Sequence, residues 1–229
     1  TNYSPRVSEF SSLDEIPDGM PYKYGKRVDN QESYAIATYG KLEAITRQTI
    51  INDDLNALLS FKSHGEAAAR KVGDVAYAAI TTNPTMGDSV ALFATGHANY
   101  IGSGASGAGA PGVATLAAGI KAMAIQKDAQ GLQNLNISPV YFLAPHALEG
   151  AAEVFFKSVN YVDSNTIATD SSLAATRANP YSGDRFKRVY DARLDTALAT
   201  GWYLAAAQGK TVTVFFLNGV QAPYLEERD

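Results

Sequence analysis

A long helical stretch that begins at Ser63 is the sequence feature that most constrains the fold of this chain. Ser63 and Glu66 form a capping-box pattern, in which each side chain can satisfy a backbone N–H of the other residue. Asn83-Pro84 ends the stretch, because the residue before a proline is kept out of helical geometry. Gly73 weakens the helix by about 1 kcal/mol relative to alanine, which favours a kink. The apolar stripe recurs at one-face helical spacing and comprises Ala68, Val72, Val75, Ala76 and Ala79. At 1.5 Å per residue, a helix over residues 63–82 would be roughly 28 Å long.

The residues before this helix alternate in the manner of β-strands. Tyr34, Ile36 and Thr38 alternate with alanines, and a second alternating run follows through Leu42. Gly40 interrupts the two runs, and glycine can adopt the positive φ that a tight turn needs. The pattern predicts a two-stranded ribbon that turns near Gly40. Because an isolated ribbon is marginal in water, this one must pack on something.

Two further segments flank the ribbon. Residues 1–32 carry Pro5, Pro17 and Pro21 without a helical or strand period, which favours an extended arm over a packed element. Such an arm could be a free tail or could lie across a neighbour. On the other side, Asn52-Asp53-Asp54 is typical of a helix start, because short polar side chains accept from free N–H groups. The apolar face of that helix would be Leu55, Leu58 and Leu59.

Beyond residue 84, helical and strand patterns alternate. A short apolar run spans residues 90–93, a helix is predicted over 113–127, and residues 140–143 have the character of a buried strand. Pro145 suits the first position of a further helix. The predicted inner face of that helix is Leu148, Ala152, Phe155 and Phe156. Residues 158–184 are polar and turn-rich, and so long a stretch without regular structure is usually functional or mobile.

The chain closes with three strand candidates, at residues 202–207, 211–217 and 220–225. Asn218-Gly219 separates the last two, and this dipeptide is the strongest short hairpin signal. Val212, Val214 and Phe216 would share one face by period two. The predicted class is therefore α+β, with interleaved helices and mostly antiparallel strands, and no internal repeat is present.

Composition removes several functional classes. The chain of 229 residues has 46% apolar and 18% charged residues, which are ordinary values for a folded protein. Its formal charge of −4 argues against nucleic acid as the main partner, since duplex binding depends on clustered cations. The absence of cysteine excludes disulfides, thiol nucleophiles and thiolate metal sites. No apolar run reaches the roughly 20 residues that cross a bilayer, so we expect no membrane partner.

A glycine-rich loop matches a dinucleotide-binding pattern only superficially. Gly102, Gly104 and Gly107 satisfy G-x-G-x-x-G, and Asp128 lies at about the distance of a ribose-binding acid. The residues before Gly102 are too polar for the buried strand that such a site requires. Pro111 also delays the following helix, which moves its N-terminus away from a pyrophosphate. We therefore expect no cofactor.

Hydrolytic and metal chemistry are equally weakly supported. Ser106 lies between small residues, with His97 and His146 as conceivable bases, but the loop lacks the second glycine of a nucleophile elbow. Both histidines have simpler structural explanations near a turn and a helix start. His64 adds no paired metal-ligand spacing to them. We assign no catalytic, cofactor-binding or metal-binding residue. The 13 tyrosines favour assembly as a group, because a ring with a polar tip suits interfaces, although any single one is more readily a core residue.

The local sequence carries a more specific resemblance. The run YGKLEAITRQ at residues 39–48, continuing into INDDL at 51–55, resembles the segment of Mu-like major head subunits of tailed bacteriophages that leads into their spine helix. Weaker matches recur along residues 34–226. They are Ala67 to Arg70, Asn83-Pro84, Leu92-Phe93 with His97 and Asn99, Ile137-Ser138-Pro139, Trp202-Tyr203-Leu204, and Gly219 with Pro223-Tyr224-Leu225-Glu226.

The resemblance implies the tailed-phage major capsid fold. Its parts would be an N-terminal arm at 1–32, an extended β-ribbon loop at 33–50, a spine helix of the peripheral lobe at 51–84, and an axial lobe with closing strands at 85–229. Relatives of this kind continue with a further strand, so part of the peripheral lobe is expected to be missing here. Some relatives are fused to a prohead protease, whose motif this chain lacks.

The implied function is a structural virion protein that self-assembles into the icosahedral head of a tailed phage or prophage, in the host cytoplasm. Its partners would be other copies of itself, scaffold or protease and portal during assembly, and packaged DNA only non-specifically. The ribbon would supply the assembly contacts Tyr34, Ile36, Tyr39, Gly40, Lys41 and Leu42. A non-enzymatic surface-binding module and a small hydrolase remain the alternatives.

Overall fold

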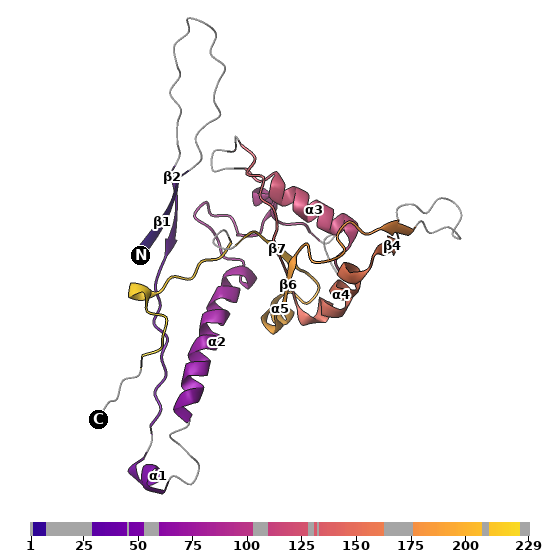
Figure 1. The fold of residues 1–229 in the computed structure, drawn as a ribbon. Helices are drawn as coiled ribbons and strands as arrows, with labels where there is room; N and C mark the ends of the chain where they lie inside the picture. Colours follow the sequence, from indigo (N-terminus) through magenta and orange to yellow (C-terminus); the bar gives the residue numbers. More distant parts are fainter. Residues whose placement is uncertain are drawn as a thin grey trace, which may run out of the picture.

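The computed structural model describes residues 2–7, 29–44, 46–52, 60–102, 110–127, 131, 133–162, 176–207 and 211–224. Figure 1 shows two parts side by side. One is a lobe of helices around a small sheet, and the other is a long helix accompanied by extended chain. The structure contains both helices and strands, which confirms the predicted mixed α+β class.

The sheet of the lobe is built on β3 (Tyr141–Ala144). This strand pairs in parallel with β6 (Lys187–Tyr190) and antiparallel with β7 (Tyr203–Ala205). Burial alternates along β3, so that Phe142 and Ala144 face the core. The prediction of a buried strand at residues 140–143 is confirmed, and so is a strand within 202–207.

Two helices supply the rest of the core. They are α3 (Val113–Ala124) and α4 (Glu149–Lys157), the second preceded by the short 3-10 helix η3 (His146–Leu148). Pro145 stands directly before η3, as its preset φ favours, and the predicted inner face of α4 is confirmed. The buried cluster comprises Leu116, Phe142, Ala144, Ala152, Phe156, Tyr181 and Phe186. The rings of Phe142 and Phe156 meet edge to face, with centroids 5.1 Å apart.

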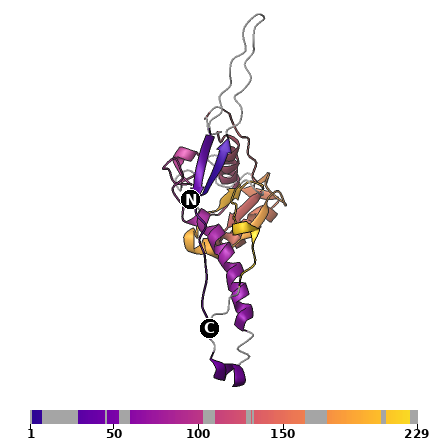
Figure 2. The same cartoon turned by 90° about the vertical axis from the view of Figure 1, so that its left-hand side faces the viewer.

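The long helix is α2 (Ser60–Thr81), and it runs without interruption through Gly73. It begins three residues before the predicted capping box and ends before Asn83-Pro84, as predicted. A short helix α1 (Arg47–Asn52) precedes it. Asn52 lies within α1 instead of before a helix, and Asp53, Asp54, Leu55, Leu58 and Leu59 lie outside the described residues. Figures 1 and 2 both place α1 beyond the end of α2 that is remote from the lobe.

The predicted ribbon turning at Gly40 is wrong. The observed ribbon pairs β1 (Asn2–Val7) with β2 (Asp29–Tyr34), antiparallel, with Asn2 opposite Tyr34. Residues 35–44 form no strand and run past α2 towards α1 as one extended segment, in which Gly40 does not take a positive φ. Glycine permits a turn without requiring one. Part of the supposed arm at 1–32 is thus a strand, and Pro5 is tolerated because a two-stranded sheet has only edges.

The closing meander is also only partly present. Among the described residues, 211–217 and 220–224 form no strand. Asn218-Gly219 does make a turn with positive φ, 53° and 73°, within the 3-10 helix η5 (Leu217–Gly219). The turn was predicted correctly, but its flanks do not pair, because a hairpin needs a surface on which to bury one face.

Short elements complete the fold. In the stretch predicted to lack structure, β4 (Asn160–Val162) pairs antiparallel with β5 (Thr176–Ala178), and residues 163–175 lie outside the described part. The helix α5 (Ala192–Ala197) follows β6 directly, and the 3-10 helix η2 (Thr95–His97) lies in the connection after α2. The apolar run at 90–93 contributes one β-bridge, between Thr85 and Ala91.

Candidate assembly surface

Five of the six predicted contact residues lie on the extended segment 35–44, and the sixth, Tyr34, is the last residue of β2. Its apolar side chains are open to solvent: Ile36 is 45% exposed, Tyr39 58% and Leu42 87%. Lys41 is exposed too, and a Cβ added at Gly40 would meet nothing within 4 Å. Exposing large apolar side chains costs free energy in water, so their clustering makes this segment a candidate contact surface.

Contacts with α2 hold this segment in place. The ammonium of Lys71 lies 4.6 Å from the centroid of the Tyr39 ring, a cation–π contact. Two turns nearer the start of α2, His64 and Glu43 form a hydrogen bond between Nε2 and the carboxylate. The segment is therefore anchored at two points along the helix, with Leu42 left exposed between them.

A second apolar segment, residues 211–224, was not predicted as a contact surface. Its exposed large apolar side chains are Val212, Val214, Phe215, Leu217, Val220 and Tyr224. The Phe215 ring stacks on Tyr34 at the end of β2, with centroids 4.8 Å apart and planes 13° apart. The alternating pattern was interpreted as a strand of a closing meander, but in the structure these residues form no strand and most of them face solvent. An alternating run signals a surface of this kind when no neighbouring strand is available to pair with it.

Exposed apolar side chains outnumber buried ones in the part of the chain that the structure describes. Ten apolar residues are buried there, whereas eighteen large apolar residues are exposed. Half of the eighteen lie on residues 35–44 and 211–224. Large exposed apolar patches mark interaction sites in proteins, so these two segments are the candidate contact surfaces.

The connection between α2 and the lobe is a hydrogen-bonded loop. Asn83 bonds both backbone groups of Phe93, accepting from its N–H at 2.6 Å and donating to its carbonyl at 3.2 Å. His97 places Nε2 2.7 Å from an Asp88 carboxylate oxygen and Nδ1 3.1 Å from the Leu92 carbonyl. The hydrogen bond with Asp88 raises the pKa of His97, and the same bond lowers the pKa of Asp88. His97 thus has a structural role in this loop.

Each of the two conceivable hydrolase bases has a carboxylate partner in the described structure. His146 bonds Glu149 at 2.7 Å, which raises its pKa, whereas His97 is paired with Asp88. Ser106, Gly104, Gly107 and Asp128 lie outside the described residues. No group of three or more possible metal ligands occurs among the residues described. No described helix is long and apolar enough to cross a membrane.

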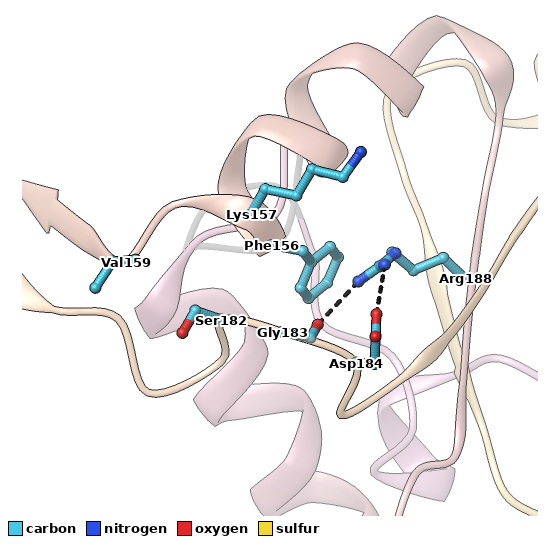
Figure 3. A pocket seen from close by; sticks show the side chains of 7 residues that line it. All are labelled: Phe156, Lys157, Val159, Ser182, Gly183, Asp184 and Arg188. Atoms are coloured by element: carbon cyan, nitrogen blue, oxygen red, sulfur yellow. Dashed lines mark hydrogen bonds and ion pairs between the residues drawn. The ribbon is translucent and has the colours of Figure 1, made fainter.

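A hollow of about 450 Å³ lies at the end of α4 (Figure 3). Its lining comprises Phe156, Lys157, Val159, Ser182, Gly183, Asp184 and Arg188. The Arg188 guanidinium donates to the Gly183 carbonyl and to Asp184, both at 2.9 Å, and to Glu153 at 3.0 Å. Lys157 also pairs with Glu153, at 3.1 Å. The cations of this hollow are neutralised by neighbouring carboxylates, which gives it no evident ligand chemistry.

A family model described as phage capsid protein matches residues 30–229. The chain belongs to this phage capsid protein family. No curated protein and no solved structure matches the chain. This capsid protein is a structural protein of the virion that self-assembles into the shell of the phage head.

The family match confirms the resemblance to phage capsid subunits. It spans β2, the exposed segment 35–44, α2, the lobe and the apolar segment 211–224, so both apolar segments lie within the matched region. The kinship with Mu-like head subunits in particular, and the absence of enzymatic activity, stay predictions.

Proposed function

We propose that copies of this capsid protein join through the two apolar segments, residues 35–44 and 211–224, to build the icosahedral head of a Mu-like tailed phage or prophage. The observation that carries the proposal is that Ile36, Leu42 and Val220 are exposed to solvent in the described structure. Covering such side chains in a neighbouring copy releases water from apolar surface, which is the main favourable term in protein association.

In this proposal α2 is the spine helix, and residues 110–207 form the axial lobe around which copies make rings. The β1–β2 ribbon takes the role that was predicted for residues 33–50, reaching over a neighbouring copy. The support is the arrangement in Figure 1, in which ribbon, extended segments and α2 lie to one side of the lobe. Extended elements give large contact areas, and symmetric repetition gives avidity without any strong single contact.

Other partners follow from the resemblance. Assembly would take place in the host cytoplasm, with scaffold or protease and portal as further partners. Packaged DNA would meet the inner surface only non-specifically, in keeping with the formal charge of −4. Tyr34 and Tyr39 would serve within the subunit, holding the apolar segments in place, because each already has an intramolecular partner.

The substitution Leu42→Asp tests the proposal. Thr38→Asp is the matched control, because it adds the same charge to the same exposed segment at a polar position. We expect the wild type and Thr38→Asp to form rings or shells, and Leu42→Asp to remain monomeric with an unchanged circular dichroism spectrum. Sedimentation velocity and negative-stain imaging measure the difference. Assembly of Leu42→Asp at wild-type concentrations would refute the assignment of this segment.

A further inference from the structure

We infer that Arg193 is a positioning residue for assembly, which fixes the angle between α2 and the lobe. The inference rests on the proposed function to the extent that it takes α2 as the spine and the lobe as the ring-forming body. It concerns how one subunit keeps the angle between α2 and the lobe constant, which the proposed function does not specify.

One guanidinium joins the two parts. Arg193 is the second residue of α5, and its backbone N–H donates to Asp191, which caps that helix. Its Nε donates to Asp74 of α2 at 2.6 Å, and its Nη1 donates to Asp191 at 3.0 Å. Its Nη2 reaches the Arg70 carbonyl, also on α2, at 3.4 Å. A single cation thus binds one carboxylate from each part and a backbone carbonyl of α2.

The surface of α2 is shaped to receive this side chain. A Cβ built at Gly73 would lie 3.1 Å from Arg193 Nη2 and 3.4 Å from its Cζ, a tight contact that would shift the guanidinium by a few tenths of an ångström. One turn further along, the Tyr77 ring lies with its centroid 5.4 Å from the guanidinium carbon. Burial raises the pKa of Tyr77, and the Asp191 carboxylate adds to this effect. Glycine lowers the intrinsic stability of a helix interior. At position 73 it leaves the space beside the helix that the Arg193 side chain occupies.

The bonding pattern restricts orientation as well as distance. A guanidinium presents its donors in a rigid planar fork, whereas an ammonium is a point charge on a flexible stem. Binding Asp74 and Asp191 from different edges of one fork therefore fixes the relative direction of α2 and α5. Among the described helices and strands, α5 is the element that α2 contacts most extensively, and Figures 1 and 2 both place the two helices close together.

A constant angle matters for a closed shell. Rings of identical subunits close only when each copy presents its contact surfaces in the same relative orientation. Releasing Arg193 from α2 leaves every contact surface intact but makes their relative orientation variable. The expected consequence is association without regular closure.

The experiment is a spin-label distance measurement on the soluble subunit. The chain has no cysteine, so Ala67→Cys on α2 and Ala151→Cys on α4, both exposed positions, provide two unique labelling sites. This background is combined with Gly73→Ala or with Arg193→Lys. The matched control is Gly65→Ala, the same change on the same helix where an added Cβ meets nothing within 4 Å.

We expect a single narrow distance in the parent and in Gly65→Ala, and loss of that narrow peak in both Gly73→Ala and Arg193→Lys. Circular dichroism should show folded protein in every variant. Gly73→Ala and Arg193→Lys should give irregular aggregates where the parent gives regular particles. A narrow, unshifted distance in both variants would overturn the inference while leaving the proposed function intact. If the variants lose the narrow distance but the parent subunit never assembles, that result would instead count against the proposed function.

Discussion

Phe156 is the side chain on which the lobe depends most. It is fully buried on α4, and its ring meets those of Phe142, Phe155 and Phe186 with centroids 5.1, 5.3 and 5.9 Å away, all edge to face. The helix carrying it packs α3, the sheet and the segment before β6 into one cluster. Removing this ring therefore leaves a cavity that several elements share.

We expect Phe156→Ala to lower the free energy of unfolding by about 4 kcal/mol, in the middle of the usual range of about 3–5 for a buried phenylalanine. Three edge-to-face contacts are lost together, each worth about 0.5–1.5 kcal/mol beyond burial. Domains are stable by only about 5–15 kcal/mol, so the loss is a large share of the total. With an m-value near 2 kcal/mol per molar urea, the midpoint should fall by roughly 2 M.

Urea unfolding followed by far-ultraviolet circular dichroism at a low subunit concentration measures this change. Val154→Ala is the matched control, because it truncates an apolar side chain of the same helix that is 69% exposed. The control should differ from wild type by no more than about 0.5 kcal/mol. A loss below about 1 kcal/mol for Phe156→Ala would show that this cluster does not hold the lobe together.

Three further predictions concern polar groups. Asn179→Ala should cost about 1–3 kcal/mol in urea unfolding, because the buried amide donates to the two carbonyls at the end of α4 at 2.8 and 3.2 Å. The His97–Asp88 pair should stabilise most between the lowered pKa of Asp88 and the raised pKa of His97. The His97 contribution is lost as pH rises through its folded-state pKa and that of Asp88 as pH falls through its own, so His97→Gln should flatten the thermal midpoint between pH 5.5 and 8. Asp195, whose pKa is lowered by accepting from two backbone N–H groups of η3, stabilises above the unfolded carboxyl pKa, so Asp195→Asn should remove part of the loss of thermal stability on acidification below pH 4.

Elements whose own residue pattern shows which side is buried were predictable from the sequence. The apolar run of β3 and the face of α4 each carry the period of one element with one buried side, and the helical period of α2 predicted that helix although Val72 of its stripe is exposed. Pairing between strands is not shown in this way. The alternation through Tyr34, Ile36 and Thr38 predicts a strand, but residues 35–44 form none, and the strand that ends at Tyr34 pairs with β1. The same limit applies to Val212 and Val214, whose alternation gives no indication of whether a sheet is available to cover them.

The assembly residues were predictable in part. The resemblance directed attention to residues 34–42, and the structure leaves the apolar members Ile36 and Leu42 exposed there. The contact between Arg193 and Asp74 spans 119 positions of sequence, so no local pattern could have predicted it. The helix itself carries one sign of this contact. Gly73, Asp74 and Tyr77 lie close together on its surface, and none of them belongs to its apolar stripe.

The measurement that tests the central claim most directly is sedimentation velocity with negative-stain imaging of the chain over a wide concentration range. If this capsid protein assembles through its exposed segments, rings, tubes or shells should form as the concentration rises. The same preparation with Leu42→Asp should stay at the mass of one chain, 24.3 kDa. A wild-type chain that remains a monomer at every concentration would contradict the account.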